Sequence, residues 1–143
     1  RPDLAALADA DGVHVGQEDV SVAAARRIVG PGRLVGLSTH SVRQALSAPA
    51  QGADYVGFGP LYATPTKAGR PAIGLKGVRT VAAKLRIPFF AIGGVDRATL
   101  PAILGAGATR ISVSRAVLDA ADPRKETKVL MKLLEGRSRG AVS

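Results

Sequence analysis

Cysteine is absent from this chain of 143 residues, and aromatic side chains make up only 3% of it. The lack of cysteine excludes disulfide frameworks, thiolate metal sites and cysteine nucleophiles. With so few aromatic rings, the chain offers little of the stacking surface that nucleic-acid-binding domains use. No apolar run reaches the roughly 18 residues of a membrane-spanning helix. We therefore expect a cytoplasmic protein that binds neither nucleic acid nor membrane.

The chain is rich in aliphatic residues and in positive charge. Hydrophobic residues make up 46% of it, and 20 basic against 11 acidic residues give a formal net charge of +9. A chain of this size has room for one hydrophobic core. A positive field favours anionic partners such as phosphorylated metabolites. We expect one domain over residues 1–143, with a flexible tail from 136 to 143.

Five short apolar runs, each followed by a helical pattern, organise the sequence. The expected strands are 12–16, 34–38, 54–59, 88–94 and 110–114, and the expected helices lie near 21–29, 41–51, 75–86, 97–105 and 124–135, after a helix end at 2–9. Such alternation predicts βαβ units and a parallel sheet, and therefore an α/β fold. Asp11 and Asp54 stand where strands begin, and we expect both to have structural roles.

The strands are predicted to have one bulky face and one nearly bare face. Successive side chains of a strand point to opposite faces, so Gly57 shares a face with Gly59. By the same count, Ala91 is expected on the bare face, and Phe90 and Ile92 on the bulky face. Repeated glycine on one face indicates backbone that is open to a ligand, or tight interior packing.

Two successive strand ends have groups suited to phosphate. Gly93 and Gly94 lead from the fourth strand towards a helix, and Ser112 and Ser114 end the fifth strand. Backbone N–H groups at such turns, with a helix N-terminus behind them, can bind an anion. Of the two serines, Ser114 is better placed to donate a hydrogen bond.

The loop that follows the third strand is the most distinctive segment. Thr64 and Thr66 alternate around Pro65, which favours an extended chain with both hydroxyls on one side. Lys67 adds a point charge suited to phosphate. The composition predicts an anion-binding loop, although an ordinary surface loop could also have it.

Polar residues follow the first two strands. Asp19 could hold Mg²⁺ beside a diphosphate, or it could cap the next helix. Ser38 and His40 could meet a substrate, with His40 as an acid, a base or only a hydrogen-bonding group. Ser41 is the expected cap of the helix that follows. His14, within a strand, is expected to be an interior packing or polar-layer residue.

The motifs together resemble the thiamine phosphate synthase family. They are HVGQED at 14–19, GLSTHS at 36–41, GADYVGFGPLYATPTK at 52–67, AIGGV at 91–95 and SVSRAV at 112–117. The resemblance implies a phosphate-binding (βα)₈ TIM barrel. It implies a transferase of thiamine biosynthesis that joins a hydroxymethylpyrimidine diphosphate to a thiazole phosphate and releases diphosphate with Mg²⁺.

The resemblance also assigns roles to single residues. It implies that Asp19 is a Mg²⁺ ligand and that Ser38 and Lys67 are catalytic contacts to the pyrimidine diphosphate. The remaining residues are those expected to hold the thiazole phosphate, namely Thr64, Thr66, Gly94, Val113 and Ser114.

The sequence departs from the family pattern at its start. The family places an Asn-Asp pair, which includes a second Mg²⁺ ligand, just before the position of Arg1, and a Gln/Arg/Lys cluster earlier still. Both are absent here, as are the first three strands of the barrel. We expect five βα units with open sheet edges, which could pair in a homo-oligomer. We also expect residues 1–143 to be inactive alone, or to belong to a longer natural chain.

Two other functions stay open. A thiazole tautomerase-like barrel would use His40 for proton transfer, but the relatives of that kind lack the paired threonines of the 59–67 loop. A five-stranded flavodoxin-like sheet could instead bind a phosphorylated ligand without catalysis. A barrel acting on sugar phosphates would need a catalytic lysine or paired carboxylates at its strand ends, and none appears in these strands.

Overall fold

The computed structural model describes residues 1–63 and 71–138. Its strands are β1 (Gly12–Val15), β2 (Leu34–Thr39), β3 (Tyr55–Phe58), β4 (Phe89–Ile92) and β5 (Ile111–Ser112), and they form one parallel sheet in chain order. Its helices are α1 (Pro2–Leu7), α2 (Val22–Val29), α3 (Val42–Ser47), the 3₁₀ helix η1 (Pro49–Gln51), α4 (Gly74–Lys84), α5 (Leu100–Gly105), α6 (Arg115–Leu118) and α7 (Pro123–Ser138). The predicted alternation and the α/β class are confirmed.

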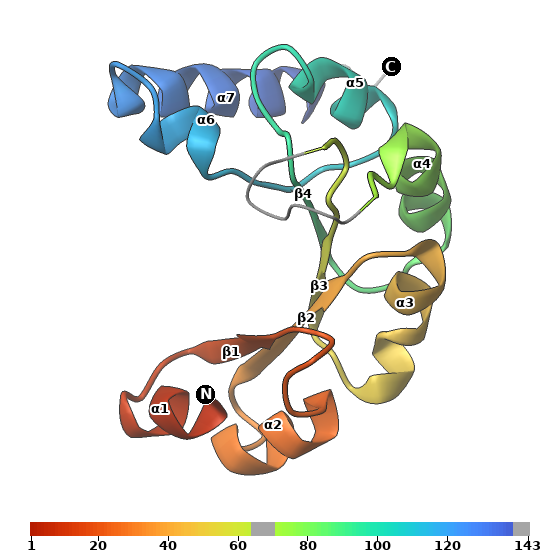
Figure 1. The fold of residues 1–143 in the computed structure, drawn as a ribbon, viewed down its shortest axis with the longest axis vertical. Helices are drawn as coiled ribbons and strands as arrows, with labels where there is room; N and C mark the ends of the chain where they lie inside the picture. Colours follow the sequence, from red (N-terminus) through yellow and green to blue (C-terminus); the bar gives the residue numbers. More distant parts are fainter. Residues whose placement is uncertain (64–70, 139–143) are drawn as a thin grey trace.

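The sheet curves into an open arc, with the helices on its convex side (Figure 1). Helices α1 and α2 lie at one end of the arc, and α6 and α7 lie at the other. Parallel strands need crossover connections, and here each crossover includes a helix. All strands therefore end at the same edge of the sheet. In α/β proteins this carboxyl edge is where ligands bind.

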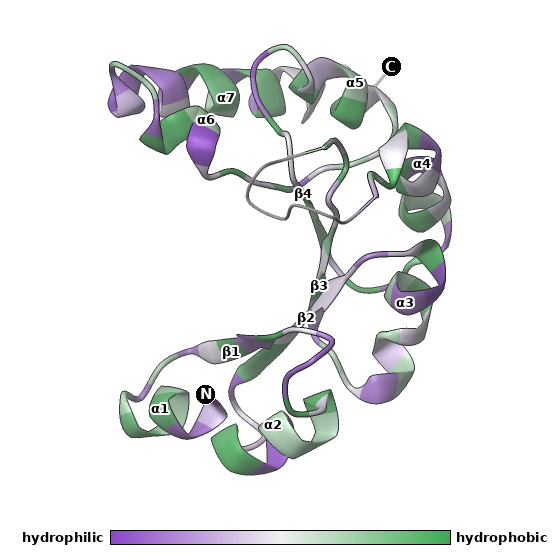
Figure 2. Cartoon of the chain, in the orientation of Figure 1, coloured by the Kyte–Doolittle hydropathy of each residue, from purple (hydrophilic) through white to green (hydrophobic). Residues whose placement is uncertain are grey.

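The hydrophobic core fills the space between the convex face and the helices. Val35, Val56 and Phe58 are fully buried on the sheet side, and Val78 and Val81 of α4 are fully buried opposite them. Burying side chains of this size stabilises a fold by about 1.5–3 kcal/mol each. The outer helices are amphipathic. Helix α7, for example, alternates between hydrophobic and hydrophilic residues along its length (Figure 2).

Strand β4 presents the face opposite to the one predicted. Phe89 and Ala91 are its buried residues, and they pair in register with the buried residues of β3. Phe90 consequently lies beside Gly57 on the concave face, and Ile92 is 39% exposed there. The prediction was wrong because it grouped small residues with small ones. In the structure, the bulky Phe90 is next to the space left by Gly57, and the small Ala91 faces the helices.

Helix ends follow ordinary capping chemistry. The hydroxyl of Ser41 accepts a hydrogen bond from the amide of Gln44 at 3.2 Å, which confirms the predicted cap of α3. Ser21 caps α2 in the same way. Such caps are worth about 1 kcal/mol each. Helix α7 continues to Ser138, so the first three residues of the expected tail are helical, and 139–143 lie outside the described residues. No helix in the described part of the chain could cross a membrane.

Candidate active site

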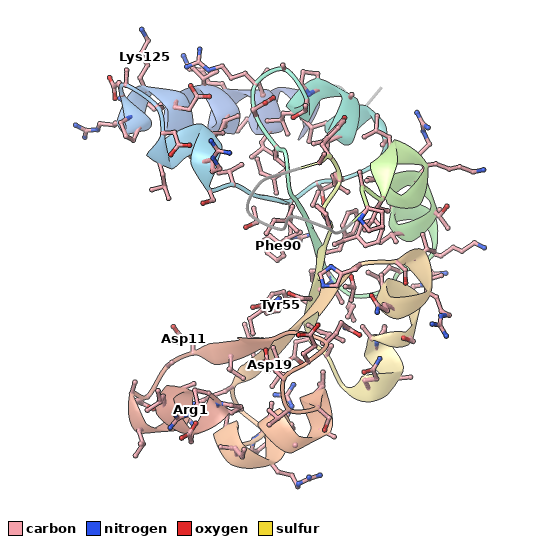
Figure 3. The ribbon with its side chains drawn as sticks, viewed as in Figure 1. Arg1, Asp11, Asp19, Tyr55, Phe90 and Lys125 are labelled. Carbon is pink, nitrogen blue, oxygen red and sulfur yellow. The ribbon has the colours of Figure 1, made fainter. Side chains whose placement is uncertain are left out.

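A cavity of about 1050 Å³ opens on the concave side of the sheet. Its lining includes residues from every strand or strand end, among them His14, Ser38, Tyr55, Gly94, Val113 and Ser114. Figure 3 shows Tyr55 and Phe90 projecting from neighbouring strands into this concave side. The fold thus brings together four of the predicted site residues (Ser38, Gly94, Val113 and Ser114).

Ser38 is held by residues of the neighbouring strand and its loop. The side-chain amide of Gln17 donates to the carbonyl of Ser38 at 2.6 Å. The hydroxyl of Ser38 lies 2.9 Å from Nε2 of His14. Both the backbone and the side chain of Ser38 are therefore fixed from β1 and the segment after it.

A row of rings crosses the concave face beside Ser38. Nδ1 of His14 lies 3.2 Å from the hydroxyl of Tyr55, and the two ring centroids are 5.4 Å apart. The ring of Phe90 meets Tyr55 edge-on at 5.6 Å. Gly36 makes room for this row, because a Cβ there would overlap both Tyr55 and Nδ1 of His14. His14 was expected to be an interior packing or polar-layer residue. It does make polar contacts on the concave face, but its side chain is exposed, so the expectation of an interior position is wrong.

His40 is oriented by backbone and amide groups. Its Nδ1 lies 2.7 Å from the carbonyl oxygen of Gly59, which can only accept, so Nδ1 carries the proton. The backbone amide of His40 donates to Oε1 of Gln44 at 2.7 Å. No described carboxylate hydrogen-bonds to this ring. The hydrogen bonds of His40 instead connect the end of β2 to Gly59, which is a structural role.

Asp19 lies in the loop between β1 and α2 (Figure 3), and its carboxylate closes that loop. Oδ2 accepts a hydrogen bond from the amide of Gly16 at 2.7 Å. Because Ser21 caps α2, the alternative role of Asp19 as the helix cap is wrong. Asp19 is exposed and is not part of the cavity lining.

Asp19 could serve as one ligand of a metal ion, but the described residues near it could not complete the coordination shell. The described residues contain no group of three or more side chains that could chelate a metal. Mg²⁺ is usually held by one or two carboxylates, with water and substrate phosphates as its other ligands. An exposed Asp19 with one oxygen already fixed fits that pattern as a single protein ligand.

The turn after β4 is built from two glycines in the left-handed region. Gly93 has φ of 91° and Gly94 has φ of 70°, which side chains rarely adopt. A Cβ on Gly94 would also lie 2.6 Å from Cβ of Tyr62. The amides of Leu61 and Tyr62 donate to the carbonyls of Ile92 and Gly93 at 3.0 and 3.2 Å. The start of the loop after β3 is therefore hydrogen-bonded directly to the end of β4.

Thr99 and Asp96 stabilise this glycine turn by hydrogen bonds. The hydroxyl of Thr99 donates to the carbonyl of Gly94 at 2.8 Å, and the amide of Thr99 donates to Oδ1 of Asp96 at 2.8 Å. That amide is the main reason that the pKa of Asp96 is lowered, and partial burial opposes it. The same hydrogen bonds that lower this pKa hold Asp96 and Thr99 together behind the turn.

The end of β5 lies beside this turn, because Ser112 pairs with Ile92 at the end of β4. Ser114 precedes α6, but its side chain makes no capping hydrogen bond to that helix. Its hydroxyl is exposed, and Val113 beside it is half-buried. The other predicted phosphate contacts, Thr64 and Thr66, lie outside the described residues, as does Lys67.

A family model described as thiamine monophosphate synthase matches residues 1–117. The chain belongs to this family. A thiamine-phosphate synthase of Gloeobacter violaceus is 53% identical over 127 residues, which are 89% of this chain and 37% of that protein. One from Thermus thermophilus is 51% identical over 137 residues, which are 95% of this chain and 66% of that protein.

A solved structure agrees with this membership. Thiamine phosphate pyrophosphorylase from Pyrococcus furiosus matches with a TM-score of 0.87 and 38% identity, over 95% of this chain and 65% of that one. This chain therefore spans about two thirds or less of the relatives that it matches. The predicted resemblance to the thiamine phosphate synthase family is confirmed.

Three residues in and around this cavity were missed in the sequence. Tyr55 lies two residues before Gly57, and strand alternation alone would have put it on the ligand face. Gln17 lies in the HVGQED motif at 14–19, but nothing in the sequence pairs it with the carbonyl of Ser38. Thr99 lies three residues after Asp96, a spacing typical of helix starts, and that signal could have found it.

Proposed function

We propose that this chain provides a large part of the active site of a thiamine phosphate synthase. The reaction joins 4-amino-2-methyl-5-hydroxymethylpyrimidine diphosphate to a thiazole phosphate, giving thiamine phosphate and diphosphate. The proposal includes Mg²⁺ as the metal and a cytoplasmic location. It rests on family membership and on one observation: Ser38 and the two anion-suited strand ends, at Gly94 and Ser114, line the same cavity.

The residues suit a reaction that needs charge neutralisation more than acid–base catalysis. In the proposed dissociative mechanism, the diphosphate leaves the pyrimidine methylene carbon with the bonding electrons. The thiazole nitrogen then attacks the resulting cation. Ser38 and Lys67 would donate to the departing diphosphate, and fixed donors aimed at developing charge are a large source of catalysis. The site's two ends would hold the reacting atoms in line.

The thiazole phosphate would sit at the carboxyl ends of β4 and β5. The backbone N–H of Gly94 would donate to the phosphate there. The hydroxyl of Ser114, which makes no capping hydrogen bond to α6, would be a second donor. Thr64 and Thr66 would complete this site from the loop pinned to the end of β4. Many (βα)₈ barrels bind phosphate at two such successive strand ends.

Asp19 would hold Mg²⁺. When bound, the metal supplies positive charge to the diphosphate oxygens. The contribution of the chain is to fix the carboxylate, and the hydrogen bond from the amide of Gly16 does so.

We further propose that the sheet is the last five βα units of a (βα)₈ barrel. The outer edges of β1 and β5 carry no strand partner among the described residues, and a barrel closes only when such edges pair. On this proposal, residues 1–143 alone show no synthase turnover, and the open edges could pair in a homo-oligomer. Turnover by that segment at the rate of the natural chain would overturn this part of the proposal.

The test of function is diphosphate release by the natural chain that contains these residues, mixed with both substrates and Mg²⁺. Ser38→Ala removes a hydrogen bond to a charged group, so kcat/KM should fall roughly 10- to 100-fold. Ser47→Ala is the matched control, because Ser47 is an exposed serine on α3 whose side-chain hydrogen bonds, among the described residues, are to Gln44 and Gln51 nearby in sequence. Release of no diphosphate by the unmodified chain would overturn the proposed function.

A further inference from the structure

We propose that His14 and Tyr55 form a positioning pair that fixes the hydroxyl of Ser38 as a hydrogen-bond donor towards the cavity. This inference rests on the proposed function, which makes the ligand of Ser38 an anionic diphosphate. Neither His14 nor Tyr55 needs to touch the substrate in this role.

The geometry joins three strands in one line. The imidazole of His14 on β1 has Tyr55 of β3 at 3.2 Å on its Nδ1 side and Ser38 of β2 at 2.9 Å on its Nε2 side. A neutral imidazole has one N–H donor and one acceptor nitrogen. The group bonded at Nδ1 therefore decides what Nε2 offers to Ser38.

With a neutral imidazole, two proton arrangements satisfy these contacts, and they differ in the group that Ser38 offers to a ligand. If Nδ1 donates to Tyr55, Nε2 must accept, and the Ser38 hydroxyl points its proton at His14. If Tyr55 donates to Nδ1, Nε2–H donates to the Ser38 oxygen. The proton of Ser38 is then directed away from the ring, where it can donate to an anion.

The second arrangement is the one that the surroundings of Tyr55 favour. Among the described residues, the hydroxyl of Tyr55 has only His14 as a hydrogen-bond partner, so donation to Nδ1 satisfies its proton. Burial, and next the charge of Asp54, raise the pKa of Tyr55, so the phenol keeps that proton. The first arrangement would leave the hydroxyl proton of Tyr55 without an acceptor among the described residues.

The rest of the site keeps the pair in place. Gly36 leaves the space in which the two rings meet, since any Cβ there would overlap both. Phe90 contacts the other side of Tyr55 edge-on, at a centroid distance of 5.6 Å. Gln17 fixes the Ser38 carbonyl, so only the hydroxyl rotor of Ser38 is left for His14 to set.

The direct test is the tautomer of His14, read from long-range ¹H–¹⁵N correlations of the imidazole nitrogens. The chain has two histidines, and they should differ. His14 should be the Nε2–H tautomer, whereas His40 should be the Nδ1–H tautomer, because it donates to Gly59. His40 is thus an internal control. Tyr55→Phe should turn His14 into a mixture of tautomers and leave His40 unchanged. An Nδ1–H or averaged His14 in the unmodified chain would overturn the proposal.

The kinetic test asks whether His14 acts through Ser38. In the natural chain, Tyr55→Phe and His14→Ala should each lower kcat/KM for the pyrimidine diphosphate roughly 5- to 10-fold. His14→Gln should restore part of the loss, because its amide can donate from the position of Nε2. In a Ser38→Ala background, His14→Ala should cost less than about twofold.

The outcomes separate this inference from the proposed function. Equal losses from His14→Ala with and without Ser38 would overturn the positioning role, even in an active synthase. An inactive natural chain, with His14 as the Nε2–H tautomer, would overturn the synthase assignment and leave the pair's control of Ser38 supported.

Discussion

The hydroxyl of Thr99 donates a 2.8 Å hydrogen bond to the carbonyl of Gly94, so the first turn before α5 fixes the turn after β4. The same threonine takes its orientation from Asp96, whose carboxylate accepts from its amide. A residue at a helix start thereby sets the direction of backbone groups at the proposed phosphate site.

Thr99→Ala should both destabilise the fold and weaken anion binding. The lost hydrogen bonds correspond to about 1 kcal/mol of unfolding free energy, the usual cost of a helix-start hydroxyl. Denaturant unfolding measures the first effect, and titration with inorganic phosphate measures the second. Thr80→Ala is the control, because the hydroxyl of Thr80 donates to the carbonyl of Lys76 within α4 and has no other hydrogen bond in the described part of the chain. Equal phosphate affinity in the two variants would contradict a role for Thr99 in the site.

Gly36→Ala should separate the rings of His14 and Tyr55. The added Cβ would overlap both side chains, and overpacking of this kind costs about 1–3 kcal/mol. Thermal unfolding and the imidazole ¹⁵N shifts of His14 report the change. In the control, Gly136→Ala at an exposed position of α7, the Cβ meets nothing within 4 Å. That variant should be as stable as the unmodified chain, or more so by about 0.5–1 kcal/mol. An unchanged His14 spectrum in Gly36→Ala would contradict the ring contact.

Asp54 should make the stability of the fold depend on acid pH. Partial burial raises the pKa of Asp54. The hydrogen bonds from the amide of Val35 and the guanidinium of Arg26 lower it by more, so the net pKa lies below the ordinary value. A lowered folded-state pKa gives stability that is complete above the unfolded pKa of about 4 and is lost as pH falls through the folded pKa.

Asp54→Asn should therefore reduce the fall in melting temperature between about pH 5 and pH 2. Asp11→Asn is the matched control at the start of another strand, since Asp11 is exposed and contributes its backbone carbonyl to the pairing with Leu34. Its pH profile should follow that of the unmodified chain. Parallel profiles for all three proteins would show that Asp54 does not contribute in this way.

Hydrophobic runs and capping residues were enough to predict the element order. The run at 34–38 and the serine at 41 encode their strand and cap locally, so β2 and α3 begin where the sequence indicates. The face of β4 could not be predicted in this way. Residues 89–92 are all apolar, and only the pairing of Phe89 with Val56 decides which of them meet the helices.

The residues of the site also differ in how well the sequence predicts them. Ser38, Gly94 and Ser114 could be found because each follows or ends a strand, and parallel strands end together. The link from Tyr55 through His14 to Ser38 joins three strands, and no local pattern encodes a contact across 41 residues. The capping alternative for Asp19 failed for a local reason, since Ser21 lies closer to the start of α2.

We propose that the carboxyl ends of β4 and β5 bind the phosphate of the thiazole substrate. A titration of the ¹⁵N-labelled chain with that thiazole phosphate, followed amide by amide, tests this binding site. We expect the largest saturable shifts at Gly94, Val113 and Ser114, and we expect Gly94→Ala to weaken binding. Saturable binding that leaves these three amides unmoved, or no binding at all, would contradict this proposal.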